Sequence, residues 1–181
     1  MRQTAQAHDL QFELYLSETA IQVRVSDLGK ALQQRYAQQH PIFLGILNGA
    51  FMFTADLVRA FGEECEVAFI KVASYEGTQS TGEIKTLIGL TNDLQNRHVI
   101  VVEDIVDTGN TMARLMPELQ AQQPASIALA TFLLKPDALL HPYLPLDYVG
   151  FEIPNKFVIG YGLDYNGSGR QLAAIYQLIG H

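Results

Sequence analysis

Cysteine is almost absent from the sequence. Cys65 is the only one among 181 residues, which excludes an intramolecular disulfide and a cysteine metal cluster. It stands among Glu63, Glu64 and Glu66, and neighbouring carboxylates are expected to raise its pKa, so we interpret it as a plain thiol. No apolar run approaches the ~18 residues of a membrane span, and the N-terminus lacks a signal-peptide pattern. We therefore expect a cytoplasmic protein without a membrane partner.

Basic residues are also scarce. The chain has 12 Lys and Arg against 19 Asp and Glu, a net charge of −7, which argues against nucleic acid as the main partner. A small anionic substrate is still allowed, because a few local cations, a metal or a helix N-terminus can hold it. The sequence has no Walker loop, no dinucleotide fingerprint, no His-Glu-x-x-His and no Gly-x-Ser-x-Gly, and this excludes the chemistries that those motifs carry.

What is present fits one globular domain, with 48% hydrophobic and 17% charged residues. Apolar residues recur every three or four positions after Ser17, which predicts a helix that Ser17 caps and His40-Pro41 ends. Val99 to Val102 is β-branched throughout, as in a strand buried on both faces of a parallel sheet. We expect the other strands at 42–47, 67–72, 126–134 and 148–153. A helix at 50–61 is apolar on most sides and therefore expected to be buried, and a further helix is expected at 110–121. This alternation predicts an α/β fold, a mainly parallel twisted sheet flanked by helices.

Two adjacent carboxylates, Glu103 and Asp104, follow the predicted central strand. Ligands of open α/β sheets bind just outside the carboxyl ends of the strands. Carboxylates there are costly without a positive or hydroxylic partner, and sugar hydroxyls and hydrated Mg²⁺ are suitable partners. A solvated strand end is the alternative explanation for the pair taken alone.

A short turn of hydroxyl, amide and glycine residues comes next. Asp107-Thr108-Gly109-Asn110-Thr111 opens the predicted helix at 110–121, and the free N–H groups of such a helix start can cradle a phosphate. Asp107 taken alone could instead be an ordinary helix cap. The carboxylate pair and the turn together, in this order and spacing, favour a binding site.

The stretch VVEDIVDTGNTM resembles the signature that binds 5-phosphoribosyl 1-pyrophosphate (PRPP) in type I phosphoribosyltransferases. The resemblance implies that Glu103 and Asp104 face the ribose hydroxyls and a metal, and that the 5′-phosphate lies in the loop formed by Asp107, Thr108, Gly109, Asn110 and Thr111. It also implies that Asp107 takes the proton from N7 of a purine as general base. The fold expected from it is a single domain over 1–181, with a core at roughly 40–145 and a small hood built from the N-terminal and C-terminal segments.

A second segment, FEIPNKFVIGYGLDYN from Phe151 to Asn166, resembles the base-binding segment of hypoxanthine-guanine phosphoribosyltransferases. The resemblance assigns base binding to Lys135, Phe157, Val158 and Asp164, with Lys135 facing the exocyclic oxygen and Phe157 stacking on the purine. It places Asp164 beside pyrophosphate as well, at a second metal. Taken alone, Lys135 fits a surface lysine and Phe157 a core aromatic.

The same resemblance assigns further contacts to PRPP. It places Arg170 near pyrophosphate, Ser74 and Tyr75 in a mobile lid over 74–82, and Asn48 and Gly49 in a pyrophosphate loop. Several relatives carry lysine at the position of Asn48, so we expect backbone N–H groups of Asn48, Gly49 and Ala50 to bind pyrophosphate there.

The implied reaction joins hypoxanthine or guanine to the ribose 5-phosphate of PRPP with Mg²⁺ bound at Glu103, Asp104 and Asp164. The expected assembly is a homodimer or homotetramer. Two alternatives stay open: an enzyme of the same fold that acts on xanthine, orotate or uracil, and a regulator that binds nucleotides or RNA without turnover. The lysine favours a 6-oxopurine, because it can donate to O6 but cannot accept from the amino group of adenine.

Overall fold

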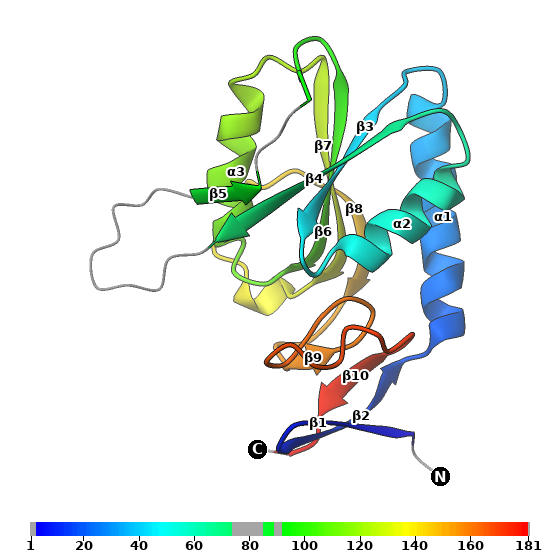
Figure 1. The fold of residues 1–181 in the computed structure, drawn as a ribbon, viewed down its shortest axis with the longest axis vertical. Coiled ribbons are helices and arrows are strands. Elements are labelled where there is room, and N and C mark those ends of the chain that lie inside the picture. The colour runs from blue at the N-terminus through cyan, green and yellow to red at the C-terminus, as the bar shows by residue number, and fades with distance from the viewer. Residues whose placement is uncertain (1–2, 74–84, 89–91, 181) are drawn as a thin grey trace.

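The computed structural model describes residues 3–73, 85–88 and 92–180, and these form two sheets (Figure 1). The larger sheet has six strands in the order β5-β4-β3-β6-β7-β8. All neighbours in it are parallel except β4 and β5, which pair antiparallel. Its strands are β3 (Ile42–Leu47), β4 (Glu66–Ala73), β5 (Lys85–Ile88), β6 (His98–Val106), β7 (Ser126–Leu134) and β8 (Leu146–Glu152). The predicted α/β fold with a mainly parallel sheet is confirmed.

Three α-helices cover the two faces of this sheet: α1 (Glu18–Tyr36), α2 (Phe51–Phe61) and α3 (Asn110–Gln120). Successive side chains of a strand point to opposite faces, so β6 contributes Ile100 to the core under α1 and α2, and Val101 to the core under α3. A short 3₁₀ helix, η1 (Pro136–Ala138), follows β7. No helix in the described ranges is long and apolar enough to cross a membrane.

The helix boundaries agree closely with those predicted from the sequence. Ser17 caps α1 as predicted, because its Oγ accepts a hydrogen bond from Ala20 N at 3.2 Å. The expectation that α2 is buried on most sides is wrong, since only one face of it is buried and Phe51 is 39% exposed. The cause lies in the packing: α2 sits over the edge of the core beside α1, so one side of it faces solvent (Figure 1).

A second, four-stranded sheet joins the two ends of the chain. Its order is β1-β2-β10-β9 and every pair is antiparallel. The strands are β1 (Thr4–Ala7), β2 (Leu10–Leu16), β9 (Val158–Ile159) and β10 (Ile175–Leu178). These strands cannot be identified individually from the sequence, because they are short and β2 pairs with β10 from the other end of the chain. Both termini lie at this end of the molecule (Figure 1).

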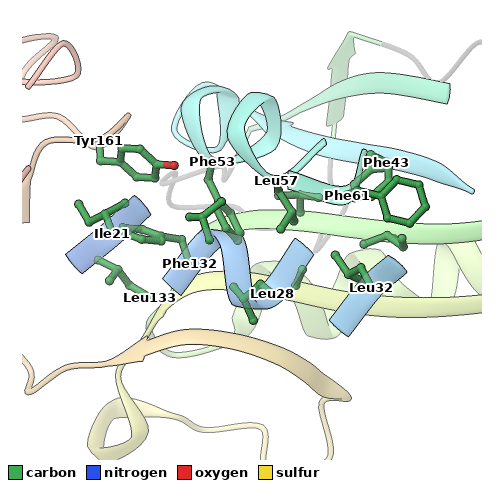
Figure 2. Packing of buried hydrophobic residues seen from close by; sticks show 14 of the residues in the cluster. Ile21, Leu28, Leu32, Phe43, Phe53, Leu57, Phe61, Phe132, Leu133 and Tyr161 are labelled. Atoms are coloured by element: carbon green, nitrogen blue, oxygen red, sulfur yellow. The ribbon is translucent and has the colours of Figure 1, made fainter. Parts of the chain in front are cut away.

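Tyr161 joins the segment after β9 to the main sheet. Its ring packs on Phe132 with centroids 4.7 Å apart, at one end of the core under α1 and α2 (Figure 2). Its hydroxyl donates to Asp56 Oδ2 at 2.8 Å. Burial, and then the hydrogen bond and negative charge of Asp56, raise the pKa of Tyr161, which keeps the hydroxyl protonated as the donor. This anchor fixes the segment that follows β9 against the carboxyl ends of the main strands.

Candidate active site

Strand β6 places the acidic pair. The strand continues to Val106, which is in register with Leu134 of β7, so the expectation that the strand ends in Glu103 and Asp104 is corrected: both lie within its last part. Pairing with the long strand β7 extends β6 beyond its β-branched stretch. Glu103 is only 8% exposed, and the Asp104 carboxylate accepts from Ile105 N at 2.8 Å. The pair is therefore held by regular sheet rather than by a solvated loop.

Glu103 is a buried carboxyl group without a full set of partners. Within the described part of the chain, its Oε2 is buried and has no hydrogen-bond partner. Burial, and then the nearby charge of Asp104, raise the pKa of Glu103 well above its ordinary value. An unsatisfied buried acid costs free energy, so this side chain suits a ligand that brings hydroxyl groups or positive charge.

The loop after β6 forms a small pocket at the start of α3. Gly109 is the N-cap of α3 with φ of 81°, a left-handed conformation that favours glycine, and no side chain caps the helix. Asp107 is therefore not a helix cap. The pocket has a volume of about 90 Å³ and is lined by Glu103 and residues 105–112. Uncapped N–H groups at a helix start bind anions, and a space of this size suits one phosphate group.

Lys135 follows β7 and lies beside this loop. It is 7% exposed, and its Nζ donates to Asp107 Oδ2 at 2.6 Å and to Asn155 Oδ1 at 3.3 Å. The alternative of a plain surface lysine does not fit a buried, paired ammonium group. Sequence reasoning missed Asn155, although it lies within the segment that resembles a base-binding region. The structure thus brings the proposed general base and the proposed base-recognising lysine into direct contact.

The Asn48-Gly49 loop after β3 also reaches the acidic pair. A Cβ built on Gly49 would lie 1.5 Å from Asp104 Oδ2, and one built on Gly162 would lie 2.0 Å from Gly49 O. Only glycine fits at either position, so Asp104, Gly49 and Gly162 are in close contact. Ala50 N already donates to Ile46 O at 3.2 Å. The Ala50 N–H, which we expected to face pyrophosphate, is therefore used within the chain.

Arg170 and Asp164 form an ion pair beside this loop. Arg170 Nη2 lies 2.6 Å from Asp164 Oδ1, and Nη1 donates to Gly162 O at 2.7 Å. Asp164 Oδ2 accepts from Gly167 N at 2.6 Å. Because Gly162 contacts Gly49, the pair lies next to the predicted pyrophosphate loop. In this arrangement the Arg170 guanidinium group and the Gly167 N–H together satisfy the Asp164 carboxylate.

Phe157 presents an exposed aromatic ring next to the base segment. It is 43% exposed, and its neighbours are Tyr165, edge-on at 5.8 Å, and Phe12 at 6.2 Å between centroids. Val158, in β9, is buried. A ring with this exposure is not a core aromatic, and one free face is what stacking on a base requires. Sequence reasoning missed Phe12, which is distant along the chain, and Tyr165, which lies in the same segment as Phe157.

Two further predictions concern the lid over 74–82 and the pKa of Cys65. Ser74 and Tyr75, together with the predicted lid over 74–82, lie outside the described residues. The pKa of Cys65 is raised as expected, but burial raises it, so the attribution to neighbouring carboxylates is replaced by the removal of the thiol from water.

A metal ion would find part of a coordination shell here. Among the described residues no group of three or more His, Cys, Asp and Glu side chains is arranged to hold one. Glu103 and Asp104 nevertheless offer the hard oxygen donors that Mg²⁺ prefers, and Glu103 Oε2 lacks a partner in the described structure. The donors fit a Mg²⁺ ion whose other ligands are water and substrate oxygens.

The comparisons with known proteins agree with this site. A phosphoribosyl transferase domain family matches residues 16–166. The chain is 40% identical to the hypoxanthine-guanine phosphoribosyltransferase of Aquifex aeolicus, over 92% of this chain and 94% of that protein. It is 37% identical to the hypoxanthine-guanine-xanthine phosphoribosyltransferase of Tritrichomonas foetus, over 97% and 95%. A crystal structure of a hypoxanthine phosphoribosyltransferase from Staphylococcus aureus superposes with a TM-score of 0.87 at 36% identity, covering 92% of this chain and 91% of that one. The chain therefore belongs to the phosphoribosyl transferase domain family, among its hypoxanthine and hypoxanthine-guanine phosphoribosyltransferases.

Proposed function

We propose that the chain transfers the 5-phosphoribosyl group of PRPP to hypoxanthine, guanine or both, giving IMP or GMP and pyrophosphate in purine salvage. The observation that carries the proposal is the 2.6 Å contact between Lys135 and Asp107. It supports the proposal because Lys135, as a donor for O6 of a 6-oxopurine, would then act beside Asp107, the proposed proton acceptor at the phosphate pocket. Adenine would leave the buried ammonium group facing another donor, which is a strong basis for rejection.

The remaining residues of the site would bind the other parts of PRPP and the base. Asp107 through Thr111 bind the 5′-phosphate in the pocket at the start of α3. Glu103 and Asp104 hold the ribose hydroxyls, which supplies the partner that Glu103 lacks within the described residues. Gly49, Asn48 and Arg170 receive pyrophosphate. Phe157 stacks on the purine, and the backbone of Val158 contacts its edge.

The chain's own groups then act on the base and the sugar. As the bond from C1 to pyrophosphate breaks, the ribose takes on oxocarbenium character and a purine nitrogen attacks C1. Asp107 takes the proton that the base loses at N7. Lys135 holds O6 and keeps Asp107 directed at the base through their hydrogen bond. Mg²⁺, bound at Glu103 and Asp104, would neutralise charge on the leaving diphosphate. We propose Asp164 for a second metal, which would require it to release Arg170.

The proposal also covers the domain organisation, the binding partners, the compartment and the oligomeric state. The chain acts as one domain over 1–181, with a core at roughly 40–145, and the four-stranded sheet of the terminal segments is the hood over the site. The partners are PRPP and the base, without nucleic acid or membrane, in the cytoplasm. A homodimer or homotetramer is the expected assembly, and light scattering on the purified protein would measure it.

The test is pyrophosphate release from PRPP with one candidate base at a time. We expect turnover with hypoxanthine or guanine and none with adenine, orotate or uracil, and the xanthine rate would set the breadth of the site. Turnover with orotate or uracil alone would assign the site to another base. Tight nucleotide binding with no pyrophosphate release from any base would favour the regulator that binds without turnover.

Phe157→Ala should raise the KM for the base, because a stacking platform is worth roughly 1–3 kcal/mol by analogy with bases on aromatic side chains. The KM for PRPP should change much less. Steady-state kinetics with each substrate varied in turn measure both values. Phe157→Tyr is the matched control, since it keeps the ring and should keep the KM. An equal loss of PRPP affinity in Phe157→Ala would show that the ring is structural.

Glu103→Gln should stabilise the substrate-free protein at neutral pH by roughly 1–3 kcal/mol, because it removes a buried acid with a raised pKa. The unfolded state ionises first as pH rises, so the penalty of Glu103 grows from its ordinary pKa up to the raised one. The gain should therefore shrink below about pH 4.

Thermal unfolding at acidic and neutral pH measures this difference. Glu152→Gln is the control, since Glu152 is exposed at the end of β8. A Glu103→Gln variant that is no more stable than the wild type at neutral pH would mean that the buried carboxyl group carries no penalty.

A further inference from the structure

The connection between β7 and β8 packs directly against the phosphate loop. Leu140 N donates to Thr108 O at 3.0 Å. A Cβ built on Gly109 would lie 2.8 Å from Leu144 Cδ1 and 3.6 Å from His141 Cβ. This connection therefore touches the loop at successive residues, through backbone and side chains. Leu140, His141 and Leu144 were not identified from the sequence, unlike Lys135 at the start of this connection.

His141 makes a second polar contact between this connection and a side chain of the loop, in addition to the contact of Lys135 with Asp107. Its Nε2 lies 2.7 Å from Asn110 Oδ1, and its Nδ1 lies 2.9 Å from the hydroxyl of Tyr143. An amide oxygen only accepts hydrogen bonds, so Nε2 must carry the hydrogen in this contact. Tyr143 engages the other ring nitrogen and thereby fixes the plane of the imidazole.

The contact with His141 restricts the side chain of Asn110, which is the first residue of α3 and lines the phosphate pocket. With Oδ1 held by His141, the amide cannot rotate freely, and its Nδ2 hydrogens are left to donate. No hydrogen bond to another described residue engages Nδ2. An anion in the pocket is the acceptor that such an oriented donor suits, and a side chain that is already fixed loses less conformational entropy when the anion binds.

We propose that His141 is a positioning residue for phosphoribosyl transfer: it orients the Asn110 amide toward the 5′-phosphate of PRPP and of the nucleotide product. The inference rests on the proposed function, specifically on the phosphate site at Asp107 through Thr111. It predicts that His141 acts on the affinity for the phosphorylated substrate and not on the base or on the proton transfer at Asp107.

The test compares wild type, His141→Ala, Asn110→Ala and the double variant in steady-state kinetics. Each single variant should raise the KM for PRPP roughly three- to tenfold, the range that one net hydrogen bond supports. The KM for hypoxanthine and kcat should stay within about twofold. Because both residues act through one contact, the double variant should be no worse than Asn110→Ala alone. His141→Gln, which keeps an N–H donor, should recover part of the PRPP affinity.

His40→Ala is the control for a general effect of removing a histidine. His40 is exposed and its Nδ1 lies 3.5 Å from Glu64 Oε2. If Asn110→Ala raises the KM for PRPP but His141→Ala does not, or if the two effects multiply in the double variant, the positioning role is refuted while the phosphate site stands. If Asn110→Ala leaves the KM for PRPP unchanged, the amide contact to phosphate itself is absent and the inference fails with it. Pyrophosphate release by the wild type reports on the proposed reaction independently of both results.

Discussion

Asp107→Asn is expected to lower kcat by about 10²–10⁴-fold, the usual contribution of a general base. The variant is nearly isosteric, and the asparagine oxygen can still accept from Lys135 Nζ, which lies 2.6 Å from the carboxylate in the native protein. The phosphate pocket is lined by Glu103 and residues 105–112, and the substitution should leave the left-handed N-cap at Gly109 unaltered. The KM for PRPP should therefore change far less than kcat.

Rapid-quench or steady-state kinetics with saturating hypoxanthine and PRPP provide the measurement. Asp137→Asn is the matched control, because Asp137 undergoes the same chemical change in the exposed helix η1, close in sequence to Lys135. Unchanged kcat in Asp107→Asn would remove this residue from the proton transfer. A parallel rise in the KM for PRPP would instead assign it to phosphate binding.

Removal of divalent metal is expected to abolish turnover, and Mg²⁺ should restore it. The described donors at the site are two hard carboxylates, Glu103 and Asp104, with no soft ligand, which suits Mg²⁺. Since no described group of three or more ligands is arranged for a metal, the protein alone should bind Mg²⁺ weakly. PRPP supplies the missing oxygens, so metal affinity should rise sharply when PRPP is present.

Calorimetric titration of Mg²⁺ into protein freed of metal, with and without PRPP, compares the Mg²⁺ affinity of the protein alone with that of its PRPP complex. Circular dichroism of the chelated sample is the control, because a catalytic metal of this kind should leave the fold unchanged. Full turnover in excess EDTA would contradict the metal's part in the reaction. Tight Mg²⁺ binding without PRPP would point to a protein-built site and would contradict the shared coordination.

Some features of the site could be predicted from the sequence because they are local. Glu103, Asp104 and the Asp107–Thr111 loop lie close together in the sequence, directly after the β-branched stretch 99–102. This position predicts that they lie at the carboxyl edge of a parallel sheet. The same holds for the main strands and helices, whose periodic apolar patterns correspond to elements in the structure. These elements and the loop can be predicted without knowing which residues distant in the sequence are in contact.

Other features could not be predicted because they depend on residues far apart in the chain. The alternation of apolar residues does not indicate that β2 pairs with β10, since this pairing joins the two ends of the sequence. The requirement for glycine at position 49 arises only from the Asp104 side chain that lies against it. The face of α2 that stays exposed depends on where α1 packs.

By itself, the sequence determined the fold class, the main elements and the contiguous phosphate loop, because backbone preference and side-chain periodicity act over a few residues. The tertiary structure alone decided that Lys135 is buried against Asp107, that Asp164 pairs with Arg170, and that His141 reaches Asn110. The Lys135–Asp107 and His141–Asn110 contacts join segments that only the folded sheet brings together, whereas Asp164 and Arg170 meet within one loop. The physical basis is clearest for Lys135: a charged group removed from water must find a partner, and the fold selects which one lies within reach.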